Sequence, residues 1–227
     1  MSDLKNSENQ SACVLTSGGI ESAVLLNDAA RRYRSVVPLY VRQTLHWEDV
    51  EIFWLKKFLR NLKQPSVAAL KILDLPIRDV YENHWSVTGT RVPDAKSADS
   101  AVYLPGRNIL FLSKAAIFAA MNDCTVIELG VLKGNPFADS TSSFFRKMGQ
   151  VLSNGLRRTI AIHAPFAKLE KQDVILKAGR LPLEQTFSCI NPKGYDHCGD
   201  CNKCLERKKA FFAAGLTDKT KYKKPGM

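Results

Sequence analysis

The chain has 227 residues, of which 45% are hydrophobic and 24% are charged. This length and apolar content suit one domain with a sizeable core and exclude a chain that stays disordered. Its apolar runs stay short of the roughly 18 residues that a membrane span needs. The first ten residues carry no secretory hydrophobic region, and six cysteines are too few for a disulfide scaffold. The sequence therefore predicts a soluble, cytoplasmic protein without a membrane partner.

Basic residues outnumber acidic ones by 33 to 22, which gives a net charge of +11. Much of the excess lies in residues 202–227, which hold eight basic and two acidic side chains. Such a segment can attract nucleic acid or small anions through its electric field. A solvated, partly disordered end is the plainer interpretation, so charge alone does not assign a partner.

Short β-rich runs alternate with longer helical stretches along most of the chain. Strands are expected at 12–16, 35–41, 67–73, 125–132 and 159–163, and helices at 22–33, 47–62, 108–122, 141–156 and 169–178. This alternation predicts an α/β fold with a doubly wound, mostly parallel sheet. In such sheets ligands bind beyond the carboxyl ends of the strands.

Three local features refine this outline. Pro38 lies inside the second expected strand, so we expect that position near an edge or a bulge. Helix 108–122 is apolar almost throughout, which predicts burial on most of its sides. Asp139-Ser140 is expected to cap the helix 141–156, and Gly179 to close the helix 169–178.

The pattern changes after residue 180, where alternation gives way to a loop, a cysteine cluster and a short basic helix. We expect four segments: a polar tail (1–10), an α/β domain (11–180), a cysteine-bearing segment with its helix (181–215) and a basic tail (216–227). Residues 89–103 are expected to form a long connection, and such connections are often functional.

The first expected strand ends in the sequence TSGGIES at residues 16–22 and runs straight into a helix. Gly18 and Gly19 allow a tight turn and a close approach of backbone N–H groups to a ligand. The helix N-terminus adds unpaired donors and a dipole that favours an anion. The pattern predicts a phosphate cradle, although it matches neither GxxxxGK[ST] nor GxGxxG. A Gly-Gly turn followed by a serine cap is the structural alternative.

Four cysteines lie close together near the C-terminal end: Cys189, Cys198, Cys201 and Cys204. Thiolates two residues apart can converge on one tetrahedral ion, and four of them close a structural zinc site. An iron–sulfur cluster remains an alternative, because C-x2-C-x2-C also occurs in cluster sites. His197 could replace one thiolate. Cys13 and Cys124 fall in expected strands and are interpreted as core residues.

The sequence YLPGRN at residues 103–108 precedes the apolar helix. Pro105-Gly106 predicts a turn, and Asn108 is a candidate N-cap. Arg107 would then be a planar cation at a helix start, which suits a phosphate or a carboxylate. A surface salt bridge explains the same residue equally well.

Together these motifs resemble those of the 7-cyano-7-deazaguanine synthase family of PP-loop ATPases. The similar features are SGG-x-[DE]-S after the first strand, LPGRN before the apolar helix, and Ser188-Cys189 followed by HCGDCNKCLERKKAF. The similarity covers roughly residues 11–215. It implies an adenine-nucleotide α-hydrolase-like fold, a structural zinc held by the four cysteines, ATP with Mg²⁺, and a homodimer.

The resemblance also implies a reaction. The family adenylates the carboxylate of 7-carboxy-7-deazaguanine, admits ammonia to form an amide, and uses a second ATP to dehydrate that amide to a nitrile. A ligase of this kind supplies a precursor for queuosine-type tRNA modification. Its expected partners are the small deazapurine and ammonia.

Carried over to this chain, the resemblance implies three groups of site residues besides the zinc cysteines. The catalytic candidates are Arg107, Glu21 and Lys171, the last of which lies in a Lys-x-acid pattern at a helix start. The substrate-binding candidates are Tyr40, Gly106, Arg107, Asn108 and Asp139. The nucleotide-binding candidates are Thr16, Ser17, Gly18, Gly19, Ile20, Glu21, Ser22, Ala23, Val24, Leu25 and Leu26.

The chain departs from the family pattern at several positions. Glu21 stands where the family has aspartate, and Ala23 where it has serine or threonine. The family's Tyr-Gly-Gln-basic-His and Tyr-Pro-Asp-Cys segments are altered at 40–46 and 135–140. A paralogue that adenylates another carboxylate or couples to another acceptor is therefore an alternative. A tRNA-modifying PP-loop enzyme is a further one, which the few aromatic residues of the basic tail do not favour.

Overall fold

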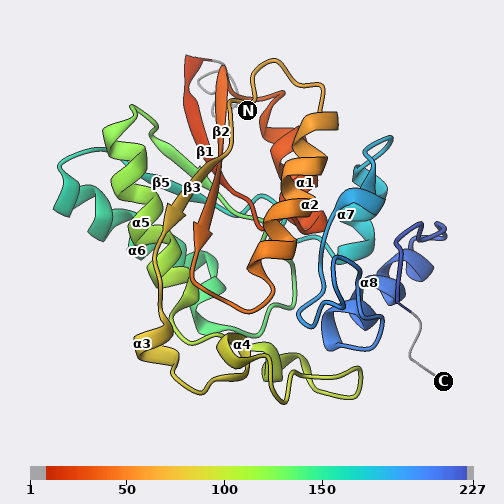
Figure 1. The fold of residues 1–227 in the computed structure, drawn as a ribbon. Coiled ribbons are helices and arrows are strands. Elements are labelled where there is room, and N and C mark those ends of the chain that lie inside the picture. The colour runs from red at the N-terminus through yellow and green to blue at the C-terminus, as the bar shows by residue number, and fades with distance from the viewer. Residues whose placement is uncertain (1–8, 224–227) are drawn as a thin grey trace.

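A computed structural model describes residues 9–223 of the chain (Figure 1). Its centre is a five-stranded parallel sheet in the order β3-β2-β1-β4-β5. The strands are β1 (Ser11–Leu15), β2 (Ser35–Arg42), β3 (Lys71–Asp74), β4 (Val126–Glu128) and β5 (Ala161–His163). The predicted α/β fold with a parallel sheet is therefore confirmed.

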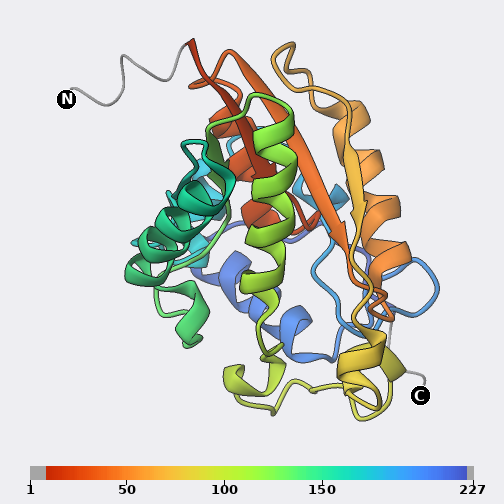
Figure 2. The same cartoon turned by 90° about the vertical axis from the view of Figure 1, so that its left-hand side faces the viewer.

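Helices cover both faces of this sheet, as expected for a doubly wound fold (Figures 1 and 2). One face carries α1 (Ile20–Ala29), α2 (Glu48–Asn61), α7 (Lys171–Lys177) and α8 (Asn202–Ala213). The other carries α5 (Arg107–Met121) and α6 (Ser142–Leu156). The short helices α3 (Arg78–Tyr81) and α4 (Trp85–Thr88) lie beyond the carboxyl ends of the strands. Among residues 9–223, each helix is too short or too polar to cross a lipid bilayer.

The central strand β1 connects the two hydrophobic cores. Ala12 and Val14 pack beneath α1 and α7, whereas Cys13 and Leu15 pack beneath α5 and α6. Successive side chains of a strand point to opposite faces, so a strand covered on both sides has no polar position. This explains the uninterrupted apolar sequence of β1 from Ala12 to Leu15. Cys13 and Cys124 are both buried core residues, as expected.

The third strand is shorter than the sequence suggests. Val67 makes only an isolated bridge to Val36, and β3 begins at Lys71. The ladder between β2 and β3 starts at Leu39, so Pro38 lies between the bridge and the ladder. Proline has no N–H to donate to a neighbouring strand. In place of the expected edge or bulge, Pro38 therefore marks a break in the pairing between β2 and β3.

Two helix starts differ from the sequence expectations. The N-cap of α5 is Gly106, whose φ of +73° favours glycine, rather than Asn108. The N-cap of α6 is Thr141, whose Oγ1 accepts a 3.1 Å hydrogen bond from the Phe144 N–H. Asp139-Ser140 instead forms a 3₁₀ turn, η3 (Ala138–Ser140), before α6. Two further 3₁₀ turns occur at η2 (Asp99–Val102), in the expected long connection, and at η4 (Leu183–Gln185).

Helix α5 is not buried on most sides, so that prediction was wrong. Leu112, Ala115 and Ala116 face the sheet and are fully buried, whereas the side chains of Ile117 and Met121 are 52% and 79% exposed. A helix in an outer layer of a three-layer packing contacts the sheet with one face only. The apolar composition of α5 therefore does not report its burial.

Residues 216–223 pack against the domain. The Arg207 Nε–H donates to Thr220 Oγ1 at 2.9 Å, and the Lys223 N–H donates to the His197 carbonyl at 2.8 Å. The expected disordered end was therefore wrong for this stretch. Residues 1–8 and 224–227, which complete the two expected tails, lie outside the described part of the chain, and the division into four segments stays a prediction.

A buried ion pair fixes α1 against the sheet. Glu128, at the end of β4, is fully buried and accepts hydrogen bonds from both terminal nitrogens of Arg32, at 2.7 and 2.6 Å. The Tyr33 hydroxyl donates to the same carboxylate at 2.8 Å. An isolated buried charge is costly, whereas a bidentate partner and a further donor satisfy it.

We predict that Arg32→Ala lowers the free energy of unfolding by about 3 to 5 kcal/mol, because Glu128 is left as an uncompensated buried charge. Urea denaturation measures this change. Arg158→Ala is the matched control, since Arg158 and Asp123 form a 3.4 Å pair whose side chains are 61% and 87% exposed. That control should cost less than about 1 kcal/mol. Equal losses in the two variants would contradict the assignment.

Candidate active site and metal centre

The turn that joins β1 to α1 is sterically determined. Gly18 has a φ of +81°, and a Cβ at this position would lie 3.2 Å from Leu55 Cβ and 3.3 Å from the Glu51 carbonyl oxygen. Both the backbone conformation and the space therefore require glycine. Thr16 enters the turn with its N–H donating to the Leu39 carbonyl at 2.8 Å. The Gly-Gly pair thus sets the direction in which α1 leaves the sheet.

The two serines of the turn bond locally. Ser17 Oγ accepts from the Gly19 N–H at 3.3 Å, and the Ser22 hydroxyl donates to the Gly19 carbonyl at 3.1 Å. Gly19 is the N-cap of α1. As a glycine it has no side chain that could accept a hydrogen bond from the first turn of the helix. The N-terminal end of α1 therefore offers backbone donors and the positive end of its dipole to an anion.

A second glycine, which the sequence analysis missed, brings β4 against this turn. A Cβ at Gly130 would lie 2.9 Å from Glu21 Cβ and 3.3 Å from the Ser22 N. The end of β4 and the start of α1 thus approach more closely than any side chain allows. A glycine inside the strand expected at 125–132 is the signal that could have identified this position, because such glycines often mark a close approach of another backbone.

These elements enclose a cavity of about 180 Å³ at the carboxyl ends of β1, β2 and β4. This is where ligands bind in open parallel sheets. The structure brings together seven of the predicted site residues in its lining: Thr16, Ser17, Glu21, Ser22, Tyr40, Arg107 and Asn108.

A larger and more open depression of about 990 Å³ lies between α6 and β5 at the sheet edge. Its lining includes Arg146, Gln150 and His163 and contains no residue of the predicted site. We place the candidate active site in the smaller cavity, because that cavity holds the N-terminal end of α1 and a cation whose buried Nε has no partner within residues 9–223.

Arg107 is that cation. Its Nε is buried and has no hydrogen-bond partner among the described residues, and its guanidinium lies 4.8 Å from the centroid of the Phe111 ring. Gly106, which was predicted as a substrate contact, is the N-cap that places Arg107 at the start of α5. A planar cation with an unpaired donor in a cavity is suited to a carboxylate or a phosphate. The alternative of a surface salt bridge is excluded, since Arg107 forms no ion pair within residues 9–223.

Asp139 performs a structural task in addition to any contact with a substrate. Its Oδ2 accepts from the Asn108 N–H at 3.1 Å, and its carbonyl accepts from Asn108 Nδ2 at 2.9 Å. It therefore caps α5 from a turn 31 residues away. Its predicted role in substrate binding stays a prediction.

Lys171 is the third catalytic candidate, and two carboxylates hold it. Its Nζ lies 2.8 Å from Glu21 Oε1 and 2.9 Å from Glu206 Oε1, and its side chain is only 11% exposed. Burial lowers the pKa of Lys171, but the two carboxylates outweigh burial and raise it. Lys171 and Glu21, which were both predicted, are thus in direct contact. Lys171 is therefore not a solvated lysine at a helix start.

Glu51 is a residue of the cavity that the sequence analysis missed. Its carboxylate accepts a 2.6 Å hydrogen bond from the Tyr40 hydroxyl. Burial raises the pKa of Glu51 to about 7, against the opposing effects of Arg107 and Tyr40. The available signal was helical spacing, because Glu51 lies midway between Trp47 and Leu55, which are four residues away on either side and both buried.

The remaining predicted nucleotide-binding residues lie inside the core. The side chains of Ile20, Ala23, Val24, Leu25 and Leu26 are 0 to 2% exposed. Only their backbone could face a nucleotide, and the Ala23 N–H already donates to the Gly19 carbonyl. Their role in nucleotide binding stays a prediction.

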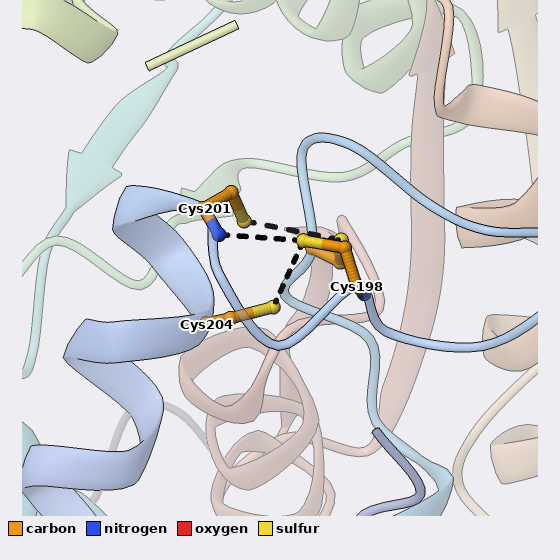
Figure 3. Close-up of side chains that lie close together, drawn as sticks. Cys198, Cys201 and Cys204 are labelled. Atoms are coloured by element: carbon orange, nitrogen blue, oxygen red, sulfur yellow. Dashed lines mark hydrogen bonds between the residues drawn. The ribbon is translucent and has the colours of Figure 1, made fainter. Parts of the chain in front are cut away.

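The four cysteines form a compact group, and Figure 3 labels three of them, Cys198, Cys201 and Cys204. Their sulfur atoms all lie within 4.8 Å of one another, with separations of 3.5 Å for Cys189–Cys198 and 3.9 Å for both Cys198–Cys204 and Cys189–Cys201. A tetrahedral zinc with Zn–S bonds of about 2.3 Å separates its thiolates by about 3.8 Å. The group therefore fits a metal such as zinc, and it is too compact for the bulk of an iron–sulfur cluster.

Backbone donors surround these sulfurs. The N–H groups of Asn191 and Cys198 each donate to Cys189 Sγ, and the Cys201 N–H donates to Cys198 Sγ, all at 3.3 Å. Such donors stabilise thiolates in a metal site.

His197 does not belong to the group. Its Nε2 accepts from the Ser188 N–H at 3.1 Å, and its ring lies between Phe187 and Tyr222. Burial lowers the pKa of His197 to about 3, so it is neutral.

Comparison with known proteins identifies the family. Residues 11–215 match the family model described as "Queuosine biosynthesis protein QueC". The chain belongs to the QueC family. It is 28% identical to the 7-cyano-7-deazaguanine synthase of Methanocaldococcus jannaschii, over 93% of this chain and 98% of that protein. The same name belongs to similar proteins of Campylobacter jejuni (28%; 95% and 99% of the two chains) and Leptospira interrogans (29%; 94% and 91%).

A solved structure of a 4-thiouridine synthetase–RNA complex with bound ATP is similar to the chain in fold. The TM-score is 0.51 at 16% identity, and the match covers 91% of this chain and 50% of that one. QueC membership thus confirms the family resemblance, and the solved structure shows a similarity in fold alone.

We predict that the purified protein is colourless and holds one zinc ion per chain. Cys201→Ser should lose the metal and lower the free energy of unfolding by more than about 3 kcal/mol, because metal binding stabilises the folded state directly. Elemental analysis and urea denaturation measure both effects. Cys124→Ala, at a buried cysteine outside the group, should keep its zinc. A brown protein that contains iron and sulfide would contradict the assignment.

We predict that Glu51→Gln stabilises the protein in a pH-dependent way. The folded state holds the Glu51 proton more tightly than the unfolded chain does, so the wild-type free energy of unfolding falls as the pH rises from 4.5 to about 7. Glutamine removes this loss. The advantage of the variant should be larger at pH 8 than at pH 4 by on the order of 3 kcal/mol. A difference that stays the same between pH 4 and pH 8 would contradict the raised pKa of Glu51.

Proposed function

We propose that this QueC-family chain is an ATP-dependent synthase that converts 7-carboxy-7-deazaguanine and ammonia into 7-cyano-7-deazaguanine. The observation that carries the proposal is the guanidinium of Arg107, whose buried Nε has no partner in the described part of the chain, in a cavity that also contains the N-terminal end of α1. A carbon–nitrogen ligase of this kind needs one place for a carboxylate and an adjacent place for the phosphates of ATP. The names of the similar proteins support the choice of substrate.

In the first step the substrate carboxylate attacks the α-phosphorus of ATP, and pyrophosphate leaves. We assign the substrate carboxylate to Arg107, whose planar fork can hold both of its oxygens. The departing pyrophosphate carries several negative charges, which the donors of the Ser17–Ser22 turn and the Lys171 ammonium can stabilise. Glu21 holds Lys171 at this end of α1. ATP would bind together with Mg²⁺, which neutralises phosphate charge when bound.

In the second step ammonia attacks the carbonyl carbon of the adenylated acid, and AMP leaves with one of the two carboxylate oxygens. The nitrogen loses one proton as the amide forms, so a nearby acceptor is useful. Glu51 lines the same cavity, and its raised pKa suits an exchange of protons near pH 7. We assign this role to Glu51, with Tyr40 holding its carboxylate.

The third step repeats the activation on the amide oxygen with a second ATP. The bond from carbon to that oxygen then breaks, AMP leaves, and the nitrogen loses its two remaining protons to give the nitrile. One cavity serves both activations in this scheme, because each transfers AMP to an oxygen on the same carbon. We further propose a structural zinc in the cysteine group, action in the cytoplasm and a homodimeric assembly.

A paralogous reaction on another carboxylate or another acceptor is the second candidate. The segment after β2 favours it, since Gln43 is fully buried and neither its Oε1 nor its Nε2 has a partner among the described residues. Gln43 follows Val41 of the cavity lining by two residues, and buried amide atoms without a partner in residues 9–223 are available to a polar group of a different ligand.

We predict that incubation with Mg–ATP, ammonium and 7-carboxy-7-deazaguanine gives the nitrile, AMP and pyrophosphate, which mass spectrometry detects. Arg107→Lys should lower kcat/KM by about 100-fold or more, because a point charge lacks the planar fork that holds developing charge. Arg146→Lys, which changes an arginine in the depression beside β5, should leave the rate unchanged. Consumption of ATP only with a different acid would support the paralogous reaction instead.

A further inference from the structure

The segment that carries the cysteines contacts the phosphate-binding turn directly. The Phe187 N–H donates to the Gly18 carbonyl at 2.7 Å. Phe187 is 1% exposed and packs against the His197 ring at 4.5 Å between centroids. It lies two residues before Cys189, and the intervening Ser188 N–H donates to His197. Cys189, the first metal ligand, is thus connected to the Gly18 carbonyl through the three consecutive residues 187–189.

A second, independent connection leaves the other side of the cysteine group. Glu206 lies on α8, two residues after Cys204, and accepts from the Lys171 ammonium at 2.9 Å. The same ammonium lies 2.8 Å from Glu21 on α1. Lys203, which is also on α8, holds the other oxygen of Glu206 at 2.6 Å. The orientation of α8 therefore determines where Lys171 lies relative to the turn.

Arg207 joins the two connections into one unit. Its side chain is fully buried, and it donates to Thr186 Oγ1 at 2.8 Å and to the Leu183 carbonyl at 2.7 Å. These acceptors lie just before Phe187, whereas Arg207 itself is adjacent to Glu206 on α8. Movement of the cysteine group would therefore displace both contacts with the nucleotide site.

We propose that Glu206 is a positioning residue which holds Lys171 beside the phosphate-binding turn, and that metal binding by the four cysteines and nucleotide binding at the turn are thereby coupled. The inference rests on the proposed use of ATP. Coupling between two sites is reciprocal, so a bound nucleotide should hold the metal more tightly, just as the metal favours nucleotide binding. Glu206 and Glu21 together fix the ammonium of Lys171, which its flexible stem alone does not.

Zinc release from the full-length, zinc-loaded protein tests this coupling. The probe is 4-(2-pyridylazo)resorcinol, which changes colour when it takes up zinc, with and without saturating Mg–ATP. We expect Mg–ATP to slow zinc release at least threefold in the wild-type protein. In Glu206→Leu the two rates should differ by less than 1.5-fold. A general loss of stability would change the zinc-release rates with and without Mg–ATP alike, so it cancels in their ratio. A merely structural role for Glu206 would therefore leave this ratio unchanged.

Two further variants complete the test. Glu184→Gln is the matched control, because it removes an exposed charge from the same segment and should keep the full protection. Glu206→Gln can still accept a hydrogen bond from Lys171 and should retain part of the protection. It also replaces Glu206→Leu if that variant does not hold one zinc per chain.

The outcomes separate this inference from the proposed function. Calorimetric titration of the wild-type protein with Mg–ATP comes first, and an absence of binding would overturn the proposed function together with the inference. If the wild-type protein binds ATP but releases zinc at the same rate with and without it, the coupling does not exist. Full protection in Glu206→Leu would show that Glu206 does not carry the coupling. Either of the last two results leaves the synthase proposal intact.

Discussion

The left-handed turn at Gly18 is the constraint on which the rest of the site depends. Its backbone conformation admits glycine, α2 leaves no room for a side chain, and its carbonyl is held by the Phe187 N–H. This turn sets where the N-terminal end of α1 lies and therefore where an anion can bind. Gly130 allows the end of β4 to close against the same point. The candidate active site thus lies where these backbone segments approach one another closely, and only a few side chains add charge to it.

The charged side chains discussed below are paired with groups of opposite charge, except for one that is available to a ligand. Lys171 is shared by Glu21 and Glu206, and the buried Glu128 on the same face of the sheet is satisfied by Arg32 and Tyr33. Buried charges are costly unless they are paired. Arg107 is the exception among the described residues of the cavity, because its Nε remains without a partner. A ligand that brings negative charge would complete the arrangement, and a carboxylate beside phosphates has that character.

Much of this arrangement follows from local sequence signals. Gly18-Gly19 predicted the turn, because the need for glycine is a property of a few adjacent residues. The four cysteines predicted a metal group, because close spacing on the chain already limits their separation in space. Alternating apolar runs predicted the parallel sheet. In each of these cases the deciding interaction involves neighbours in sequence or a pattern with a short period.

Other features depend on contacts between distant residues, and the sequence does not encode them locally. Asp139 caps α5, which begins about 30 residues earlier in the chain. Its neighbours in sequence instead suggested that it caps α6. Glu206 meets Lys171 across 35 positions, and nothing near either residue indicates the pair. Ile117 and Met121 face outward although their helix is apolar, because exposure is decided by what the other layers leave uncovered. Glu51 was detectable only through its spacing from two buried neighbours.

Amide hydrogen exchange with and without Mg–ATP tests the central claim, that nucleotide binds at the Gly18 turn, most directly. The account predicts slower exchange in peptides that cover residues 16–26 and 104–110, which surround the small cavity. Peptides that cover residues 142–163, which line the larger depression between α6 and β5, should exchange at unchanged rates. Protection confined to residues 142–163, with no change at the turn, would contradict the account.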